Sequence, residues 1–142
     1  RPLWNPESPW NKLLTSTEQR KVWADSPEGP YNNNSNTSLT THTLDLRSVK
    51  QASLTFAHRH EFETGYDFGY LEASNNGGKS WQTLQSYSGT APWKKESLDL
   101  SSFAGQSLQL RFRVKTDASV QQNGWEVDDV MVAGSQDSLL AD

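Results

Sequence analysis

Hydrophobic and polar side chains alternate along several stretches of this chain, most regularly between Ser107 and Lys115. The even-numbered positions are hydrophobic, namely Leu108, Leu110, Phe112 and Val114. The odd-numbered positions between and after them are polar, namely Gln109, Arg111, Arg113 and Lys115. A period of two is typical of a β-strand with one face in the core and one in solvent. The pattern therefore predicts a strand over 107–115 whose arginines point outward.

A second signal lies at residues 66–81, where strand-like stretches flank Asn75-Asn76-Gly77-Gly78. Asn and Gly tolerate positive φ, which a tight turn between antiparallel strands requires. We expect Phe68–Ala73 and Ser80–Leu84 to pair as a β-hairpin. The spacing Ser74-x-Asn76-x-Gly78-x-Ser80-Trp81 also resembles the hairpin motif called an Asp box, with Asn in place of Asp, and that motif is a folding device rather than a sign of catalysis.

Further strand patterns recur at intervals of roughly ten residues. They are expected at Trp10–Thr15, Lys21–Ala24, Ser38–Leu46, Ala52–Phe62, Trp93–Leu100 and Gly124–Ala133. About eight or nine short strands favour an all-β, antiparallel jelly-roll β-sandwich. We divide the chain into a lead-in with a possible first strand (1–15), a jelly-roll domain (16–134) and a C-terminal tail (135–142). Because residue 1 is Arg, we expect a segment of a longer protein.

Composition and charge narrow the classes of function. The 142 residues suit one domain, and a hydrophobic fraction of 33% is supplemented by six Trp. The chain has no Cys, which excludes a disulfide framework and a thiolate metal site. A net charge of −4 without a basic run argues against a nucleic-acid partner. No apolar run approaches the ~20 residues of a membrane span.

Several short segments follow the order and spacing of one known family. They are Trp23–Pro27, Ser38–Thr40, Leu44–Leu46, Leu54–Phe56, Tyr66–Gly69, Ser74–Trp81, Asp99–Ser101, Ala104–Gln106, Leu110–Arg113 and Gly124–Val130. Together they resemble the MAM-like jelly-roll domain of secreted bacterial peptidases of the immune inhibitor A type. The resemblance implies a jelly-roll sandwich, often with structural calcium, that serves as an accessory module beside a protease domain or in a surface protein. Related sandwiches bind proteins, bind glycans or act as scaffolds.

Asp128 and Asp129 lie in the expected last strand, where adjacent side chains point to opposite faces. A carboxylate that faces inward is costly unless it is paired or bound to a cation, and calcium takes 6–8 oxygen ligands. Related folds imply that the last-strand Asp meets an early loop, which makes Asp25 the natural partner. We predict structural calcium at Asp25, Asp128 and Asp129. In the alternative, one Asp pairs with Arg111 or Arg113 and the other is solvated.

The aromatic side chains are the best evidence for ligand binding. Trp93 and Tyr87 flank a loop, and Tyr31 begins an Asn-rich loop, so each is a candidate to stack on a sugar face. The alternative for any one of these residues is a place in the core. Trp23, Trp81 and Trp125 match family positions and are expected to anchor the core or the hairpin.

Catalytic patterns are weak in this sequence. His58 and His60 share a strand face, a spacing that zinc can use, but the sequence signals no third ligand and the pattern His-Glu-x-x-His is missing. The nucleophile motif Gly-x-Ser-x-Gly is missing too. We therefore expect a noncatalytic module of a secreted bacterial peptidase or surface protein. Its partners would be a protein substrate, a neighbouring domain or a cell-surface glycan, and the alternative function is a carbohydrate-binding module.

Overall fold

The computed structural model describes residues 3–14, 21–135 and 138–141, and these residues form β-strands with one short 3₁₀ turn. The strands are β1 (Trp4–Pro6), β2 (Asn11–Leu14), β3 (Lys21–Ala24), β4 (Asn36–Thr41), β5 (Leu44–Asp45), β6 (Ser53–Glu61), β7 (Phe68–Ser74), β8 (Gln82–Tyr87), β9 (Thr90–Asp99), β10 (Ser107–Lys115), β11 (Gly124–Ala133) and β12 (Ser138–Ala141). The 3₁₀ turn η1 spans Ser101–Phe103. The described residues contain no helix that is long and apolar enough to cross a membrane.

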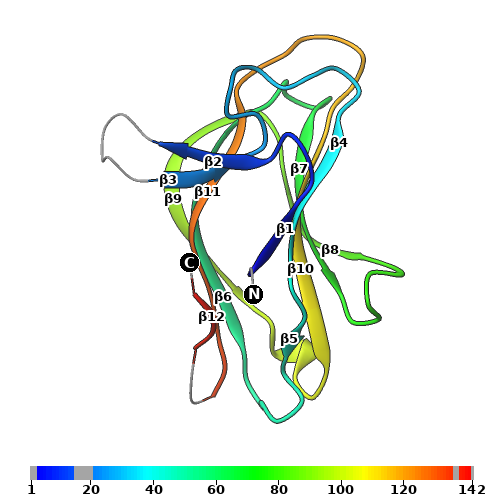
Figure 1. The fold of residues 1–142 in the computed structure, drawn as a ribbon, viewed down its shortest axis with the longest axis vertical. Helices are drawn as coiled ribbons and strands as arrows, with labels where there is room; N and C mark the ends of the chain where they lie inside the picture. The colour runs from blue at the N-terminus through cyan, green and yellow to red at the C-terminus, as the bar shows by residue number, and fades with distance from the viewer. Residues whose placement is uncertain (1–2, 15–20, 136–137, 142) are drawn as a thin grey trace.

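Two antiparallel sheets pack face to face (Figure 1). The first sheet has the order β1-β4-β10-β7-β8, with β5 also paired to β10. The second sheet has the order β2-β3-β11-β6-β9, with β12 also paired to β11. Apart from the consecutive pairs β2–β3, β7–β8 and β11–β12, neighbours in each sheet are distant in the sequence, as in a jelly roll, so the predicted fold class is confirmed.

Alternation along the strands creates the core between the sheets. In β10 the side chains of Leu108, Leu110, Phe112 and Val114 are all buried, which confirms the inward parity expected from the sequence. Trp125 and Val127 of β11 and Phe56 of β6 cover them from the opposite sheet, and Trp125 meets Phe112 edge-on with 5.3 Å between ring centroids. Each aromatic ring removes a large apolar area from water, and this offsets the modest hydrophobic content.

The hairpin between β7 and β8 forms as expected and projects from the body of the sandwich (Figure 1). Gly77 and Gly78 adopt φ values of 74° and 87°. The Oδ1 atom of Asn76 accepts hydrogen bonds from the Ser74 hydroxyl at 2.8 Å and from the Ser80 N–H at 3.0 Å. Asn76 thus performs the turn-fixing task for which an Asp box uses aspartate.

Both ends of the chain contribute strands to the sheets. Strand β1 pairs with β4, and β2 pairs with β3, so the lead-in belongs to the sandwich and its possible first strand, expected at Trp10–Thr15, is seen as β2. Thr15 lies outside the described residues. Strand β12 lies in the segment expected to be a tail and pairs with β11, where Leu140 is buried in the core. The sequence did not predict these pairings because β1 and β12 are only three and four residues long, which is too short for a clear alternation of hydrophobic and polar residues.

Candidate functional site

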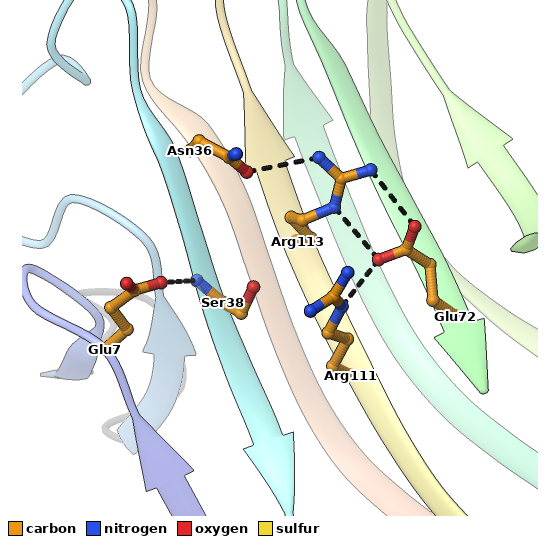
Figure 2. A network of polar contacts seen from close by, with 6 residues as sticks. All are labelled: Glu7, Asn36, Ser38, Glu72, Arg111 and Arg113. Carbon is orange, nitrogen blue, oxygen red and sulfur yellow. Dashed lines mark hydrogen bonds and ion pairs between the residues drawn. The ribbon is translucent and has the colours of Figure 1, made fainter. Parts of the chain in front are cut away.

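The outer surface of the first sheet carries a network of polar side chains centred on Glu72 (Figure 2). Glu72 lies on β7 opposite Arg111 of β10, and Tyr70 lies opposite Arg113. Residues that pair directly across two strands share a face, so these side chains all lie on the surface away from the core. We call this surface the β10 face and define it by Tyr70, Glu72, Trp81, Arg111 and Arg113.

Three guanidinium N–H groups converge on the carboxylate of Glu72. Its Oε1 accepts from Arg111 Nε at 2.7 Å and from Arg113 Nε at 2.9 Å, and its Oε2 accepts from Arg113 Nη2 at 3.1 Å. Burial opposes ionisation of Glu72, but the hydrogen bonds from Arg113 and Arg111 outweigh it and lower the pKa of this carboxyl. The network is therefore charged and fixed in the folded protein.

Aromatic rings hold the two guanidinium groups from the side. Arg111 lies over the indole of Trp81, with its Cζ 4.1 Å from the ring centroid, and Arg113 lies over Tyr70 at 4.8 Å. The ring faces carry partial negative charge, which favours a cation at these distances. Only about a fifth of each Arg side chain is exposed (22% and 19%), so both arginines have defined positions.

A second polar feature is a cluster of three carboxylates, Glu63, Asp67 and Asp117, whose oxygens lie within 4.8 Å of one another. Asp67 is fully buried: its Oδ2 accepts the Tyr31 hydroxyl at 2.6 Å and its Oδ1 accepts the Asp117 N–H at 2.8 Å. Among the described residues this is the one group of three potential metal ligands at such distances. The cluster joins the loop before β7 to the loop after β10.

The carboxylates of this cluster fit a hard cation. Glu63 Oε1 is buried without a hydrogen-bond partner, and burial together with the negative charges of Asp117 and Asp67 raises the pKa of Glu63. Carboxylates this close repel one another unless a proton or a cation lies between them. Calcium binds through oxygen ligands such as carboxylates, so these three side chains are chemically suitable donors for that ion. Sequence reasoning missed the cluster because its members are distant in the chain.

The residues predicted to bind calcium lie elsewhere. Asp25 directly follows β3 and is buried beside the start of β11, where its Oδ1 accepts the Trp125 N–H at 2.7 Å. Burial raises the pKa of this carboxyl to about 7. Asp128 is buried on β11, whereas Asp129 is exposed at a bulge with φ of 51°. Asp25, Asp128 and Asp129 do not form a group of three potential metal ligands in the structure. Calcium at these positions stays a prediction.

The alternative for Asp128 and Asp129 paired one of them with Arg111 or Arg113. The structure shows that both arginines pair with Glu72 instead. The physical reason is the topology: β10 and β7 are neighbours in the first sheet, and β11 belongs to the second. The sequence signal for the β10 face was the pair of outward-facing arginines on one strand. Residue spacing could not show that their partner is Glu72 on β7.

The three aromatic candidates have different positions. Trp93 on β9 is 39% exposed, and the Arg59 guanidinium lies over its ring at 5.5 Å. Tyr87 is half-buried against Trp125, and its hydroxyl donates to Glu96 Oε2 at 2.6 Å. Tyr31 is only 2% exposed. Its place in the core leaves no ring face for a ligand, so of the three only Trp93 offers an exposed ring.

His58 and His60 point into the sandwich rather than to its surface. His58 Nδ1 accepts the indole N–H of Trp125 at 3.1 Å, so its proton is on Nε2, which lies 2.9 Å from Glu96 Oε1. Burial lowers the pKa of His58. His60 Nδ1 lies 2.8 Å from the Gly89 carbonyl oxygen. These contacts give both rings structural roles.

Comparison with curated proteins finds bacterial peptidases. The chain is 31% identical over 120 residues to Bacillopeptidase F of Bacillus subtilis (strain 168), covering 84% of this chain and 8% of that protein. It is 32% identical over 106 residues to Immune inhibitor A of Bacillus thuringiensis subsp. alesti, covering 67% of this chain and 15% of that protein. The chain thus spans a small part of these relatives.

Comparison with solved structures supports the fold. The carbohydrate-binding module TmCBM61, solved in complex with β-1,4-galactotriose, superposes with a TM-score of 0.57 at 10% identity, over 93% of this chain and 87% of that one. The family described as "Immune inhibitor A-like, MAM domain" matches residues 28–142. The match to this family model confirms the resemblance read from the sequence. The chain belongs to the family of Immune inhibitor A-like MAM domains.

Proposed function

We propose that this domain is a noncatalytic binding module of a peptidase that acts outside the cell, and that its ligand surface is the β10 face. The observation that carries the proposal is the shared carboxylate of Glu72, which fixes two arginines that also stack on Tyr70 and Trp81. A surface whose donors and rings are already ordered loses little entropy when a ligand binds. The peptidase relatives support an accessory role for such a surface.

Two classes of ligand match this role. The module would hold a protein substrate or a neighbouring domain near the peptidase, or it would hold the peptidase on a cell-surface glycan. The likeness to a galactotriose-binding module concerns the fold and supports the glycan only by analogy. The polar character of the β10 face favours the glycan.

We further propose that calcium fixes the loops at one end of the sandwich, bound by Glu63, Asp67 and Asp117. The support is the convergence of three carboxylates and the unpartnered, buried Oε1 of Glu63. The ion would supply the positive charge that this cluster lacks. Since Tyr31 donates to Asp67 and Asp117 belongs to another loop, the ion would join the 31–35, 63–67 and 116–119 segments.

The test uses the full peptidase chain and a Tyr70→Ala, Arg113→Ala variant. Hydrolysis of a short chromogenic peptide is measured, together with retention of each chain by an insoluble bacterial cell-wall fraction. We expect kcat/KM for the peptide to stay within twofold while retention falls at least tenfold. A loss of peptide hydrolysis in a folded variant would contradict a noncatalytic role, and unchanged retention would contradict the assignment of the β10 face.

A further inference from the structure

The carboxylate of Glu72 is saturated by its own neighbours. It accepts three N–H groups at 2.7–3.1 Å, two from Arg113 and one from Arg111. Arg113 also donates through Nη1 to Asn36 Oδ1 at 3.1 Å (Figure 2). Both sides of the Arg113 guanidinium are therefore used, and it has little capacity left for a ligand.

Arg111 differs because only one of its nitrogens, Nε, donates a hydrogen bond within the described part of the chain. Its Nε bonds to Glu72, and within the part of the chain that the structure describes neither terminal nitrogen, Nη1 or Nη2, has a hydrogen-bond partner. Stacking on Trp81 at 4.1 Å and the bond to Glu72 nevertheless fix the plane of the guanidinium. The two terminal nitrogens form a fork whose geometry matches the two oxygens of a carboxylate.

The charge of the network also remains uncompensated. Two arginines share one carboxylate, so the group of Glu72, Arg111 and Arg113 carries one net positive charge. Nearby on the same face, Lys115 lies opposite Asn36, while Glu7 at the other edge accepts the Ser38 N–H through Oε1 at 2.8 Å (Figure 2). A net positive patch is maintained on a chain whose net charge is −4.

We infer that the β10 face binds a glycan that bears carboxylate groups, with the terminal nitrogens of Arg111 gripping the sugar carboxylate. This inference rests on the proposed function and names its ligand class. A protein partner fits less well, because the fully buried core of a protein interface is more apolar than the surface around it, whereas Glu72 and two arginines occupy the centre of the β10 face. The large exposed hydrophobic residues of the described chain, Leu3, Leu14, Tyr66, Trp93, Val120 and Met131, all lie off β4, β10, β7 and β8.

The test measures binding of the full chain to polygalacturonate, to its fully methyl-esterified form and to a neutral β-1,4-galactan. Arg111→Gln removes the charge and the fork, and Arg111→Lys keeps the charge but loses the fork. Arg59→Gln is the matched control, since Arg59 also lies over a Trp (Trp93) and bonds to a Glu (Glu126, 3.0 Å) but on the second sheet. Thermal melts establish that each variant is folded.

We expect the chain to bind polygalacturonate at least tenfold more tightly than either neutral polymer. Each Arg111 variant should weaken that binding at least tenfold, and Arg59→Gln should change it less than twofold. Equal affinity for the methyl ester, or unchanged binding by folded Arg111 variants, would overturn the inference. Binding to a neutral glycan that is lost in the Tyr70→Ala, Arg113→Ala variant would overturn it too while leaving the proposed function intact.

Discussion

The carboxylate of Asp25 occupies the place where residue 124 would carry a Cβ atom, and a side chain at Gly124 would collide with Asp25 Oδ1. From there Oδ1 accepts the N–H of Trp125 at 2.7 Å. Gly124 also has φ of +85°, where a side chain is strained. The absence of a side chain at Gly124 thus allows the loop after β3 to bond through Asp25 to the first residues of β11.

This relationship predicts a large effect of Gly124→Ala on stability. The new methyl group must displace the Asp25 carboxylate, which leaves the buried Trp125 N–H unpaired, and positive φ adds strain. We expect the free energy of unfolding to fall by about 2–4 kcal/mol, as measured by urea denaturation. Gly105→Ala is the control: φ is +83° but no atom lies within 4 Å of its Cβ position, so only the strain of about 1 kcal/mol applies. Equal losses in the two variants would show that the contact with Asp25 is unimportant.

Calcium should raise the melting temperature of the protein. A melt in EDTA is compared with melts at rising calcium concentration, because an ion that binds only the folded state stabilises it by about 2.7 kcal/mol at 100 times Kd. Asp117→Asn should abolish the response, and Asp128→Asn should retain it. The reverse result would place the ion at the residues predicted from the sequence. A response lost in neither variant would contradict both sites.

The calcium response should also depend on pH. Burial and the neighbouring carboxylates raise the pKa of Glu63, so protons compete with the ion for this group. Calcium affinity is therefore expected to weaken as the pH falls through the raised pKa of Glu63. Isothermal titration at several pH values between about 5 and 8 measures this, and proton release on binding should accompany it. Affinity that does not weaken as the pH falls would contradict a ligand role for Glu63.

Glu72→Gln should destabilise the first sheet. The variant keeps the shape of the side chain but leaves two largely buried arginines without their shared anion, which we expect to cost about 1–3 kcal/mol. Glu126→Gln is the matched control, because its partner Arg59 is 47% exposed and solvent screens the pair. We expect that change to cost about 0–1 kcal/mol. Thermal unfolding of both variants compares the two sites directly, and similar losses would contradict the central role of Glu72.

His58 should make the fold less stable in mild acid. Burial lowers its pKa below the ordinary value of 6.5, so below that pH the unfolded chain takes up a proton that the folded protein resists. The contribution of His58 is present above pH 6.5 and is lost as the pH falls toward the lowered value. His58→Gln removes this titration, so the melting temperature of the variant, taken relative to that of the unchanged protein at the same pH, should rise as the pH falls from about 7 to about 5. Asp25, whose pKa is raised to about 7, has the opposite slope and is common to both proteins.

The sequence by itself determined most of the strands and the fold class. Strict alternation in 107–115 is possible only if one face is buried, and Asn-Asn-Gly-Gly at 75–78 specifies a tight turn, so β10 and the β7–β8 hairpin could be predicted with their orientation. The edge strands β1 and β12 were not predicted, because three or four residues carry too little alternation to indicate a pairing. Trp125 was correctly placed in the core or as an anchor, and the outward parity of Arg111 and Arg113 was correct.

Only the tertiary structure decided which charged residues meet. Glu72 lies 39 and 41 residues from its two arginines, and Asp67 reaches Asp117 across 50 residues. Strand order in a jelly roll brings such residues together, and a local pattern carries no information on strand order. For the same reason Tyr31, which looked like a loop residue, became a core side chain bonded to Asp67. Local backbone preferences act over a few residues, whereas the β10 face and the carboxylate cluster depend on contacts that form only when both sheets have assembled.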